Sequence, residues 1–370
     1  MTPLSHCGMK GVILVTDEPQ LPLERVEVVC PPIWARRLLG RVGARTIWVV
    51  IAGFRYRPDL YMGYYLAPGA CSALVVGRLL GRPSCYQMTG GPVGIIGGGF
   101  AAIDSIEGAL GRPSKFIESL ALRVIRKFEL VVVRGNRAKE FLATRGIKDS
   151  VAVITGCVND CRQPPQNDRD IHLIYVGRLS PVKQLGQFVT IVDSMRHFVP
   201  NIRAVIVGDG SLRRELQTCT ERLGLTENVE FLGRRRDVEV ILARSKVFVL
   251  TSKSEGLSIA MAEAMAAGVV PVVANVGDLA DLVVDGENGY LVEPGNIEEY
   301  TSKAISLLYD ESLWTQFSDR AREAARKHCS IETVTEKWRK SLRKAISEAS
   351  GCIPEEVLNN KSDDLTQMEI

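Results

Sequence analysis

The stretch VFVLTSKSEGLSIAMAEAMAAGVVPVVANVGDLADLV, residues 247–283, decides the fold of this chain. It begins with a continuous apolar run that is typical of a buried strand (residues 247–252), and a second such run follows at residues 271–276. Between them, residues 257–267 are apolar nearly all round, which predicts a buried helix. Two buried strands joined by a helix indicate a parallel sheet covered by helices.

One carboxylate, that of Glu263, lies within this apolar helix. Because burying a charge without partners is costly, we expect it to accept hydrogen bonds. The donors would be either the hydroxyls of a bound ligand or internal groups, namely backbone amides or an arginine. Gly256 lets backbone N–H groups approach a ligand, and the helix dipole favours an anion there. The block indicates a phosphate-binding site flanked by Glu255 and Glu263.

A second block, GRLSPVKQLG at residues 177–186, follows another apolar run. Ser180 and Pro181 fit the N-cap and the first position of a helix. Arg178 and Lys183 would then stand beside a helix N-terminus, where two cations suit a diphosphate. A solvated pair of surface charges is the alternative, and the presence of the first block favours the diphosphate.

The second half of the chain repeats this alternation of apolar runs and helical spacing. Helical spacing occurs at residues 181–198, 211–224 and 237–245, and strands are predicted at residues 171–177, 203–210, 229–233, 247–252, 271–276 and 289–294. This pattern predicts an α/β fold with a doubly wound parallel sheet.

The first half shows the alternation less cleanly. Residues 114–128 and 137–146 have helical spacing, residues 157–170 fit a linker, and strands are predicted at residues 11–16, 26–30, 46–53, 60–66, 83–90, 130–135 and 151–156. We therefore expect a domain at residues 1–165, a second at 166–330, a C-terminal helix at 331–348 that crosses back to the first domain, and a mobile tail at 349–370.

Length and composition agree with two domains. The chain has 370 residues, of which 46% are hydrophobic and 24% charged, and this balance excludes disordered and fibrous classes. No apolar run is long enough for a spanning helix, and no secretory signal is evident at the start. Residues 1–165 hold 21 Lys/Arg against 12 Asp/Glu, a net charge of +9, whereas the rest carries −6. This asymmetry indicates two domains with different tasks.

The cysteines and histidines indicate a reduced, metal-free protein. The nine cysteines are scattered, which predicts free thiols in a cytoplasmic protein. Cys157 and Cys161 form a close pair without a second pair or a nearby histidine to complete a zinc site. Asp168-Arg169-Asp170 imitates a D-x-D metal motif, but its place in the expected linker favours a solvated charge cluster.

Taken together, these blocks resemble the C-terminal domain of the retaining family 4 glycosyltransferases. The similar stretches are VGRLSPVKQ, IVGDGSLRRELQ, VEFLGRRRD, the opening stretch and DGENGYLVEPGN, all within residues 171–345. The first half is similar only faintly, through RPDLYMGYY, GRPSCYQMTGG and FELVVVRGNRAKEFLATRGI. The resemblance implies the GT-B architecture, in which two Rossmann-like doubly wound domains face each other across a cleft.

The resemblance also implies a nucleotide-sugar site and its residues. Arg178 and Lys183 would neutralise the diphosphate, Glu255 would hold the donor sugar, and Glu263 would bind the ribose hydroxyls. The two cations would stabilise the charge that develops on the diphosphate. Together with Glu255, which would hold the donor sugar, Arg178 and Lys183 are therefore the expected catalytic residues. The remaining donor-binding residues implied are Gly177, Gly208, Gly210, Gly233, Gly256, Leu257 and Ser258. No metal or cofactor is implied.

The first half departs from that pattern. Many relatives have a Gly-rich loop and a helix after the first strand, but here only nine residues separate the first two strands, so the domain is expected to be abbreviated. Thr89-Gly90-Gly91 stands where many relatives carry a histidine, so no catalytic histidine is assigned and these three are the acceptor-side candidates. The run at residues 90–99 would either replace part of the missing loop or serve as a flexible connection.

A further segment, IWARRLLGRVGARTIW at residues 33–48, combines arginines with two tryptophans. Such a composition fits either an interfacial membrane surface or an ordinary amphipathic helix. With the basic first half, it makes an anionic membrane surface a candidate partner and peripheral membrane attachment a candidate location.

The sequence thus predicts a retaining hexosyltransferase that uses a UDP- or GDP-sugar and needs no metal. The expected acceptor is a glycan or a lipid-linked precursor in polysaccharide or cell-envelope synthesis. A GT-B nucleotide-sugar epimerase and a non-catalytic GT-B binding subunit are the alternatives, although the retained charged site residues argue against the latter. No nucleic-acid-binding module is recognisable, so nucleic acid is not an expected partner.

Overall fold

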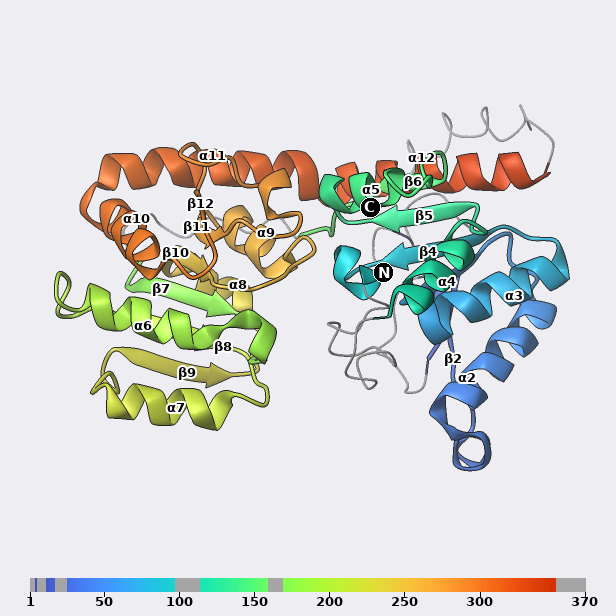
Figure 1. The fold of residues 1–370 in the computed structure, drawn as a ribbon, viewed down its shortest axis with the longest axis horizontal. Helices are drawn as coiled ribbons and strands as arrows, with labels where there is room; N and C mark the ends of the chain where they lie inside the picture. The colour runs from blue at the N-terminus through green and yellow to red at the C-terminus, as the bar shows by residue number, and fades with distance from the viewer. Residues whose placement is uncertain (1–3, 5–10, 17–24, 97–113, 159–168, 351–370) are drawn as a thin grey trace, which may run out of the picture.

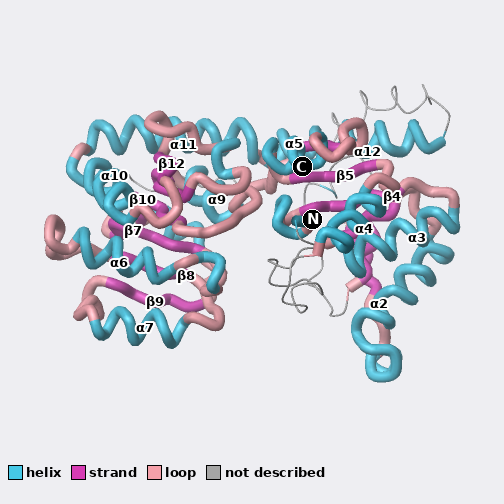
Figure 2. The backbone as a smooth tube through the Cα atoms, in the orientation of Figure 1, coloured by secondary structure: helices cyan, strands magenta, loops and turns pink. Residues whose placement is uncertain are grey.

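The computed structural model describes residues 4, 11–16, 25–96, 114–158 and 169–350. The strands of these residues form three parallel sheets, with two, four and six strands. Figure 1 shows the four-stranded and six-stranded sheets in separate halves of the molecule, and Figure 2 shows strands alternating with helices through both halves. The α/β fold with parallel sheets predicted from the apolar runs is confirmed.

The first half contains the two-stranded and the four-stranded sheet. In the smaller sheet β1 pairs with β2, and in the larger the order is β3-β4-β5-β6. The strands are β1 (Val12–Val15), β2 (Val26–Val29), β3 (Tyr61–Tyr64), β4 (Ser84–Met88), β5 (Leu130–Val133) and β6 (Val151–Val153). The helices are α2 (Ile33–Tyr56), α3 (Cys71–Leu80), α4 (Lys115–Ile125) and α5 (Asn136–Ala143).

The second half contains the six-stranded sheet, in the order β12-β11-β10-β7-β8-β9. Its strands are β7 (Ile171–Val176), β8 (Ala204–Val207), β9 (Val229–Gly233), β10 (Ser245–Leu250), β11 (Val270–Ala274) and β12 (Tyr290–Val292). Its helices are α6 (Leu185–Met195), α7 (Arg213–Arg222), α8 (Val238–Ala243), α9 (Ile259–Ala266), α10 (Ile297–Tyr309) and α11 (Glu311–Cys329). The central strands are buried along almost their whole length, as their continuous apolar sequences predict.

The last described helix, α12 (Ile331–Ser350), leaves the second half and lies against the first (Figure 1). Its buried residues Val334, Trp338, Leu342 and Ala345 recur at helical spacing. They pack in one cluster with side chains of β4, β5 and the segment after β6, namely Cys85, Leu130, Val132 and Ile154. The expected tail at residues 351–370 lies outside the described residues.

One strand prediction is wrong, because residues 46–53 are helical. They belong to α2, which has a non-helical break at Gly40. An apolar run of this length fits a strand or a packed helix equally well, so periodicity could not decide. Gly53 abuts α3, since a Cβ added there would lie 2.9 Å from Cγ1 of Val76. This close approach lets α2 pack beside α3, so the run does not enter a sheet.

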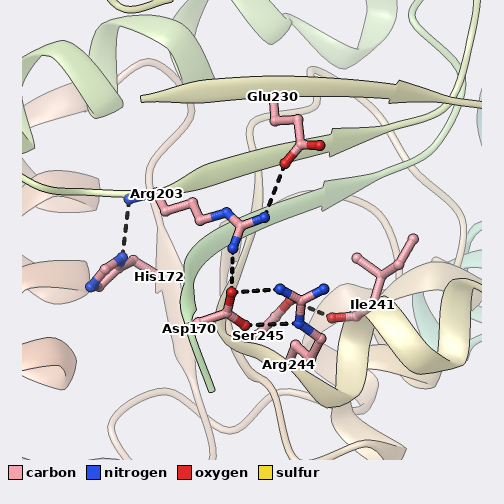
Figure 3. A network of polar contacts seen from close by, with 7 residues as sticks. All are labelled: Asp170, His172, Arg203, Glu230, Ile241, Arg244 and Ser245. Carbon is pink, nitrogen blue, oxygen red and sulfur yellow. Dashed lines mark hydrogen bonds and ion pairs between the residues drawn. The ribbon is translucent and has the colours of Figure 1, made fainter. Parts of the chain in front are cut away.

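The expected linker ends in a network of charged side chains at Asp170 (Figure 3). Arg244 donates to both carboxylate oxygens of Asp170, at 2.8 and 2.5 Å, and Arg203 donates to one of them. Arg203 also pairs with Glu230 at 3.1 Å. Asp170 therefore fixes the entry to β7, whereas Asp168 and Cys161 lie outside the described residues.

In the part of the chain that the structure describes, no helix combines the length and the apolar character needed to cross a bilayer. Six cysteines of the described residues are free thiols.

Candidate functional site

The predicted cation Lys183 and the predicted carboxylate Glu255 form an ion pair. The Lys183 ammonium lies 2.5 Å from Oε1 of Glu255. The two side chains are only 21% and 10% exposed. The two sequence blocks therefore meet in space, although 72 residues separate the partners.

The meeting point lies at the carboxyl ends of the adjacent strands β7 and β10. Lys183 ends the helical turn Pro181–Lys183, and Glu255 lies in the loop before α9. Two further bonds join the loops: the Lys253 N–H donates to the Val182 carbonyl at 2.8 Å, and the Thr251 hydroxyl donates to the Lys183 carbonyl at 3.0 Å. Polar loops at neighbouring strand ends are where α/β sheets bind ligands.

The start of α9 follows the sequence prediction closely. Ser258 is the N-cap, and its hydroxyl accepts a hydrogen bond from the Met261 N–H at 3.3 Å. Leu257 is buried, and Gly256 is partly exposed. A Cβ on Gly256 would lie 3.0 Å from the carbonyl oxygen of Thr89 in the first half of the chain. Glycine thus permits a close approach of the two halves at this loop.

Glu263 lies in the second turn of α9 and is half-buried. Its carboxylate has no hydrogen-bond or ion-pair partner among the described residues. Burial raises the pKa of Glu263 above its ordinary value, and repulsion from Glu239 raises it further. Of the two kinds of donor expected for this carboxylate, the internal kind is absent from the described part of the chain, where neither a backbone amide nor an arginine donates to it. The carboxylate keeps its capacity to accept hydrogen bonds.

The other predicted donor-side residues lie at the ends of β7, β8 and β9. Arg178 is exposed after β7, and its carbonyl accepts a bond from the Tyr175 hydroxyl at 3.0 Å. Gly208 stands at a φ of 141°, and a Cβ there would lie 1.8 Å from the Gly177 carbonyl oxygen. A Cβ on Gly210 would likewise lie 2.3 Å from the carbonyl oxygen of Leu179. These glycines are required by the packing of neighbouring loops.

Gly233 ends β9 at a φ of 66°, and its carbonyl accepts a bond from the Gly208 N–H at 2.8 Å. A Cβ there would lie 3.1 Å from a terminal nitrogen of Arg213. Arg213, at the start of α7, also lies 3.8 Å from Asp209. The sequence reasoning did not single out Arg213, although it stands in the stretch IVGDGSLRRELQ.

The acceptor-side candidates Thr89, Gly90 and Gly91 follow β4 and face the loop that holds Glu255. A Cβ on Gly91 would lie 3.6 Å from the Glu255 carbonyl oxygen. The structure therefore brings these residues to the same place as the Lys183–Glu255 pair. Gly91–Gly94 form a short helical turn, and residues 97–99 of the glycine-rich run lie outside the described residues.

A contact that the sequence did not predict joins the two halves beside this site. Asp278 is 1% exposed, and its Oδ1 accepts a hydrogen bond from the Ala138 N–H at 3.1 Å. Oδ2 of Asp281 accepts one from the Asn136 N–H at 2.5 Å. Two carboxylates of the second half thus cap the N-terminus of α5, whose own N-cap Gly135 offers no side chain.

The segment that carries Asp278 also touches the Glu255 loop. The Asp278 N–H donates to the Gly256 carbonyl at 3.3 Å, and a Cβ on Gly277 would lie 2.0 Å from the Glu255 carbonyl oxygen. Burial raises the pKa of Asp278, and its bonds from the backbone N–H groups of Ala138 and Arg137 oppose that rise. One short segment therefore connects the Glu255 loop to the first half of the chain.

No group of His, Cys, Asp and Glu side chains suited to a metal ion occurs within the described ranges. Positive groups of the described residues at these strand ends include Lys183, Arg178 and Arg213, together with the N-terminus of α9. Such groups bind phosphate oxygens through charge-assisted hydrogen bonds. The carboxylates Glu255 and Glu263 can accept hydrogen bonds from hydroxyl groups. The site can therefore hold a ligand that combines phosphates with hydroxyls.

The fold and this constellation agree with a known class of domain. Residues 159–328 match the family model described as "Glycosyl transferases group 1". The matched region contains β7 to β12 and the loops that carry Arg178, Lys183, Glu255 and Glu263. The GT-B resemblance of the second half is thus supported by a family match that covers it.

Among particular relatives, the chain is 29% identical over 168 residues to the N-acetyl-alpha-D-glucosaminyl L-malate synthase of Bacillus anthracis, covering 45% of this chain and 43% of that protein. It is also 29% identical over 167 residues to the poly(ribitol-phosphate) alpha-N-acetylglucosaminyltransferase of Staphylococcus aureus, covering 44% of this chain and 34% of the other. The chain thus spans less than half the length of each of these relatives.

Two solved structures share the fold across both halves. HepE of Anabaena in complex with UDP superposes with a TM-score of 0.69 at 20% identity, covering 90% of this chain and 99% of that one. The sucrose-phosphate synthase of Thermosynechococcus elongatus gives a TM-score of 0.73 at 17% identity, covering 94% and 92%. The fold is that of GT-B proteins, with two Rossmann-like domains.

Proposed function

We propose that this protein is a retaining glycosyltransferase of family 4 that moves a sugar from a UDP- or GDP-sugar to an acceptor hydroxyl. The observation that supports it most strongly is the Lys183–Glu255 pair at the loop before α9, the helix that also carries the Glu263 carboxylate, in a region that matches the glycosyl transferases group 1 model. A relative named as a poly(ribitol-phosphate) alpha-N-acetylglucosaminyltransferase and a structural neighbour in complex with UDP support a polymeric glycan acceptor and a UDP-sugar donor.

Each residue has a task that follows from its position. Lys183 and Arg178 neutralise the diphosphate, and the backbone N–H groups at the start of α9 add donors to it. Glu263 accepts hydrogen bonds from the ribose hydroxyls, which would supply the partners that its half-buried carboxylate lacks. Glu255 accepts hydrogen bonds from the hydroxyls of the donor sugar.

The ion pair of Lys183 and Glu255 prepares the site for the donor. Without the donor, each charge neutralises the other in a poorly solvated place. A bound diphosphate replaces Glu255 as the partner of the Lys183 ammonium. The Glu255 carboxylate is then free to accept hydrogen bonds from the hydroxyls of the sugar. A single ligand thus binds both side chains of the pair.

In the proposed reaction the bond between the anomeric carbon and the diphosphate oxygen breaks, and the acceptor oxygen forms a new bond on the same face. The leaving phosphate oxygen takes the proton of the acceptor hydroxyl, so the configuration is retained and no protein base is needed. Lys183 and Arg178 stabilise the charge that develops on the leaving diphosphate. The proposal requires no metal ion, because these cations carry that task.

The acceptor-side residues Thr89, Gly90 and Gly91 face the Glu255 loop and would admit the acceptor hydroxyl. We propose that the acceptor is a glycan or a lipid-linked precursor in polysaccharide or cell-envelope synthesis. The scattered free thiols favour a cytoplasmic location, with peripheral attachment to a membrane as part of the proposal.

The test is a donor panel. The protein is incubated with UDP- and GDP-sugars, with and without glycan and lipid-linked acceptors, and nucleotide release and products are measured with and without a chelator. We expect acceptor-dependent release of one nucleotide, a product that keeps the anomeric configuration, and no effect of the chelator. Conversion of the donor sugar without acceptor would replace this proposal by an epimerase.

A further inference from the structure

Helices α2 and α3 carry a row of exposed apolar side chains. On α2 these are Ile47, Ile51 and Phe54, which are 42%, 47% and 58% exposed, and on α3 they are Val75 and Leu79, at 56% and 68%. We call these five residues the α2–α3 face. Ile47 and Ile51 belong to the run at residues 46–53 that the sequence predicts as a strand, so the corrected helix reveals this face.

The two parts of this face point to the same side. Ile47, Ile51 and Phe54 recur at helical spacing and form one stripe. The helices run parallel, since the Thr46 hydroxyl lies 3.3 Å from the Ser72 hydroxyl at the start of α3 and Gly53 abuts Val76 further along both helices. The buried sides of both helices face Tyr61 of β3, so the stripes lie together on the outer side.

The apolar surface continues onto the first segment of α2. Ile33, Trp34, Leu38 and Val42 are exposed on either side of the break at Gly40. The rings of Trp34 and Trp48 are in edge-to-face contact, with centroids 6.1 Å apart. The contact folds the first segment back on the second. Tryptophans of this kind are enriched where an apolar phase meets water.

The same region is strongly basic. Residues 33–57 contain Arg36, Arg37, Arg41, Arg45, Arg55 and Arg57 and no acidic residue. This segment of 25 residues therefore carries six positive charges in a chain whose net charge is +3. Long arginine side chains can keep their charges in water while their stems lie on an apolar phase.

This combination is confined to the first half of the chain. Within the described residues, 15 of the 19 large exposed apolar side chains belong to it. The other four belong to the second half: Val240 lies on α8, Tyr309 ends α10 and bonds to the Phe198 carbonyl, and Phe198 and Val284 lie in loops. Scattered apolar residues are ordinary on protein surfaces, whereas a contiguous set marks an interaction site.

We infer that the α2–α3 face is a docking surface for an anionic lipid bilayer. A bilayer offers an apolar layer for the five side chains and negative headgroups for the surrounding arginines. A second copy of the chain is a poorer occupant, because it would bring two sets of six arginines together. This inference deepens the proposed membrane attachment by naming the face that binds and the charge of the lipid, and it rests on the proposed function only for the acceptor that the bilayer would supply.

The test measures retention of the full chain by vesicles of phosphatidylcholine alone and of phosphatidylcholine with phosphatidylglycerol. We expect retention by the anionic vesicles and its loss at high salt. The triple substitution I51S, F54S and L79S should lower the partition coefficient about tenfold or more. Reversing two charges with R37E and R41E should lower it by at least about fivefold for each charge.

A matched control makes the same kinds of substitution in the second half, V240S on α8 and R320E on α11, and it should leave retention unchanged. Circular dichroism and UDP binding identify variants that misfold, and both must match the wild type. Equal retention of wild type and variants, or no retention by anionic vesicles, overturns the inference. The inference is also overturned if the protein forms a dimer that the triple substitution abolishes and the vesicles retain none of the protein. Because retention is measured without donor or acceptor, its failure is distinct from a failure of glycosyl transfer.

Discussion

The ammonium of Lys183 lies 2.5 Å from Oε1 of Glu255, and this ion pair joins two loops of one sheet at the place where a donor is proposed to bind. In the proposed reaction Lys183 stabilises charge that develops on the leaving diphosphate. Lys183→Ala should therefore lower kcat/KM by about 100-fold or more, the usual cost of removing one such group. Lys253→Ala removes an exposed ammonium two residues from Glu255 and should leave the rate unchanged. Wild-type turnover in Lys183→Ala would refute the site assignment.

Glu255 and Lys183 should affect the binding of different parts of the donor. Glu255→Gln removes the carboxylate proposed to hold the donor sugar, yet it leaves the Lys183 ammonium available to the diphosphate. We expect UDP, which has no sugar, to bind this variant at least as tightly as the wild type, whereas transfer from the UDP-sugar falls about 100-fold. Calorimetry with UDP and a transfer assay measure the two quantities. A parallel loss of both would place Glu255 at the nucleotide instead.

The raised pKa of Glu263 predicts a pH dependence of nucleotide binding. Ribose hydroxyls donate to the ionised carboxylate, so protonation competes with binding. The affinity for UDP should fall as the pH falls through this pKa, by about tenfold for each pH unit below it. Calorimetric titrations of wild type and Glu263→Gln across this range separate the effect from the titration of UDP itself. An identical pH profile in both proteins would show that Glu263 does not contact the nucleotide.

The bond between Asp278 and the N-terminus of α5 should hold the two halves together. Asp278→Ala leaves backbone N–H groups of α5 without their acceptor, at a cost of about 1–2 kcal/mol in the free energy of unfolding. Asp278→Asn keeps a carbonyl oxygen at this position and should lose less. Urea unfolding measures both, with the exposed Asp319→Asn as a control. Equal stability of all three variants would mean that the capping contact contributes nothing to the folded state.

Much of the second half could be predicted from the sequence because its central strands are buried on both sides. Their continuous apolar runs locate β7 to β12, and Ser258 marks the start of α9. The residues of the site could also be named, since Lys183 and Glu255 each stand next to a helix start. Their pairing could not be predicted, because it depends on the order of strands in the sheet, where β7 and β10 are neighbours.

The first half was harder to predict for two physical reasons. Residues 46–53 have no period that separates a strand from a packed helix, and only the close contact of Gly53 with Val76 shows why the helix forms. The caps on α5 come from Asp278 and Asp281, about 140 residues away. Nothing near α5 in the sequence indicates them.

Lys183, Glu255 and Glu263 are proposed to bind one nucleotide-sugar donor, through its diphosphate, its sugar and its ribose respectively. The most direct measurement is a thermal-shift screen of the wild type and Glu263→Ala with UDP, GDP and their sugars, since a ligand of the folded state stabilises it by mass action. The predicted result is a rise in Tm of the wild type with one nucleotide family, and no rise in Glu263→Ala. Equal rises in both proteins, or none with any nucleotide, would contradict the claim.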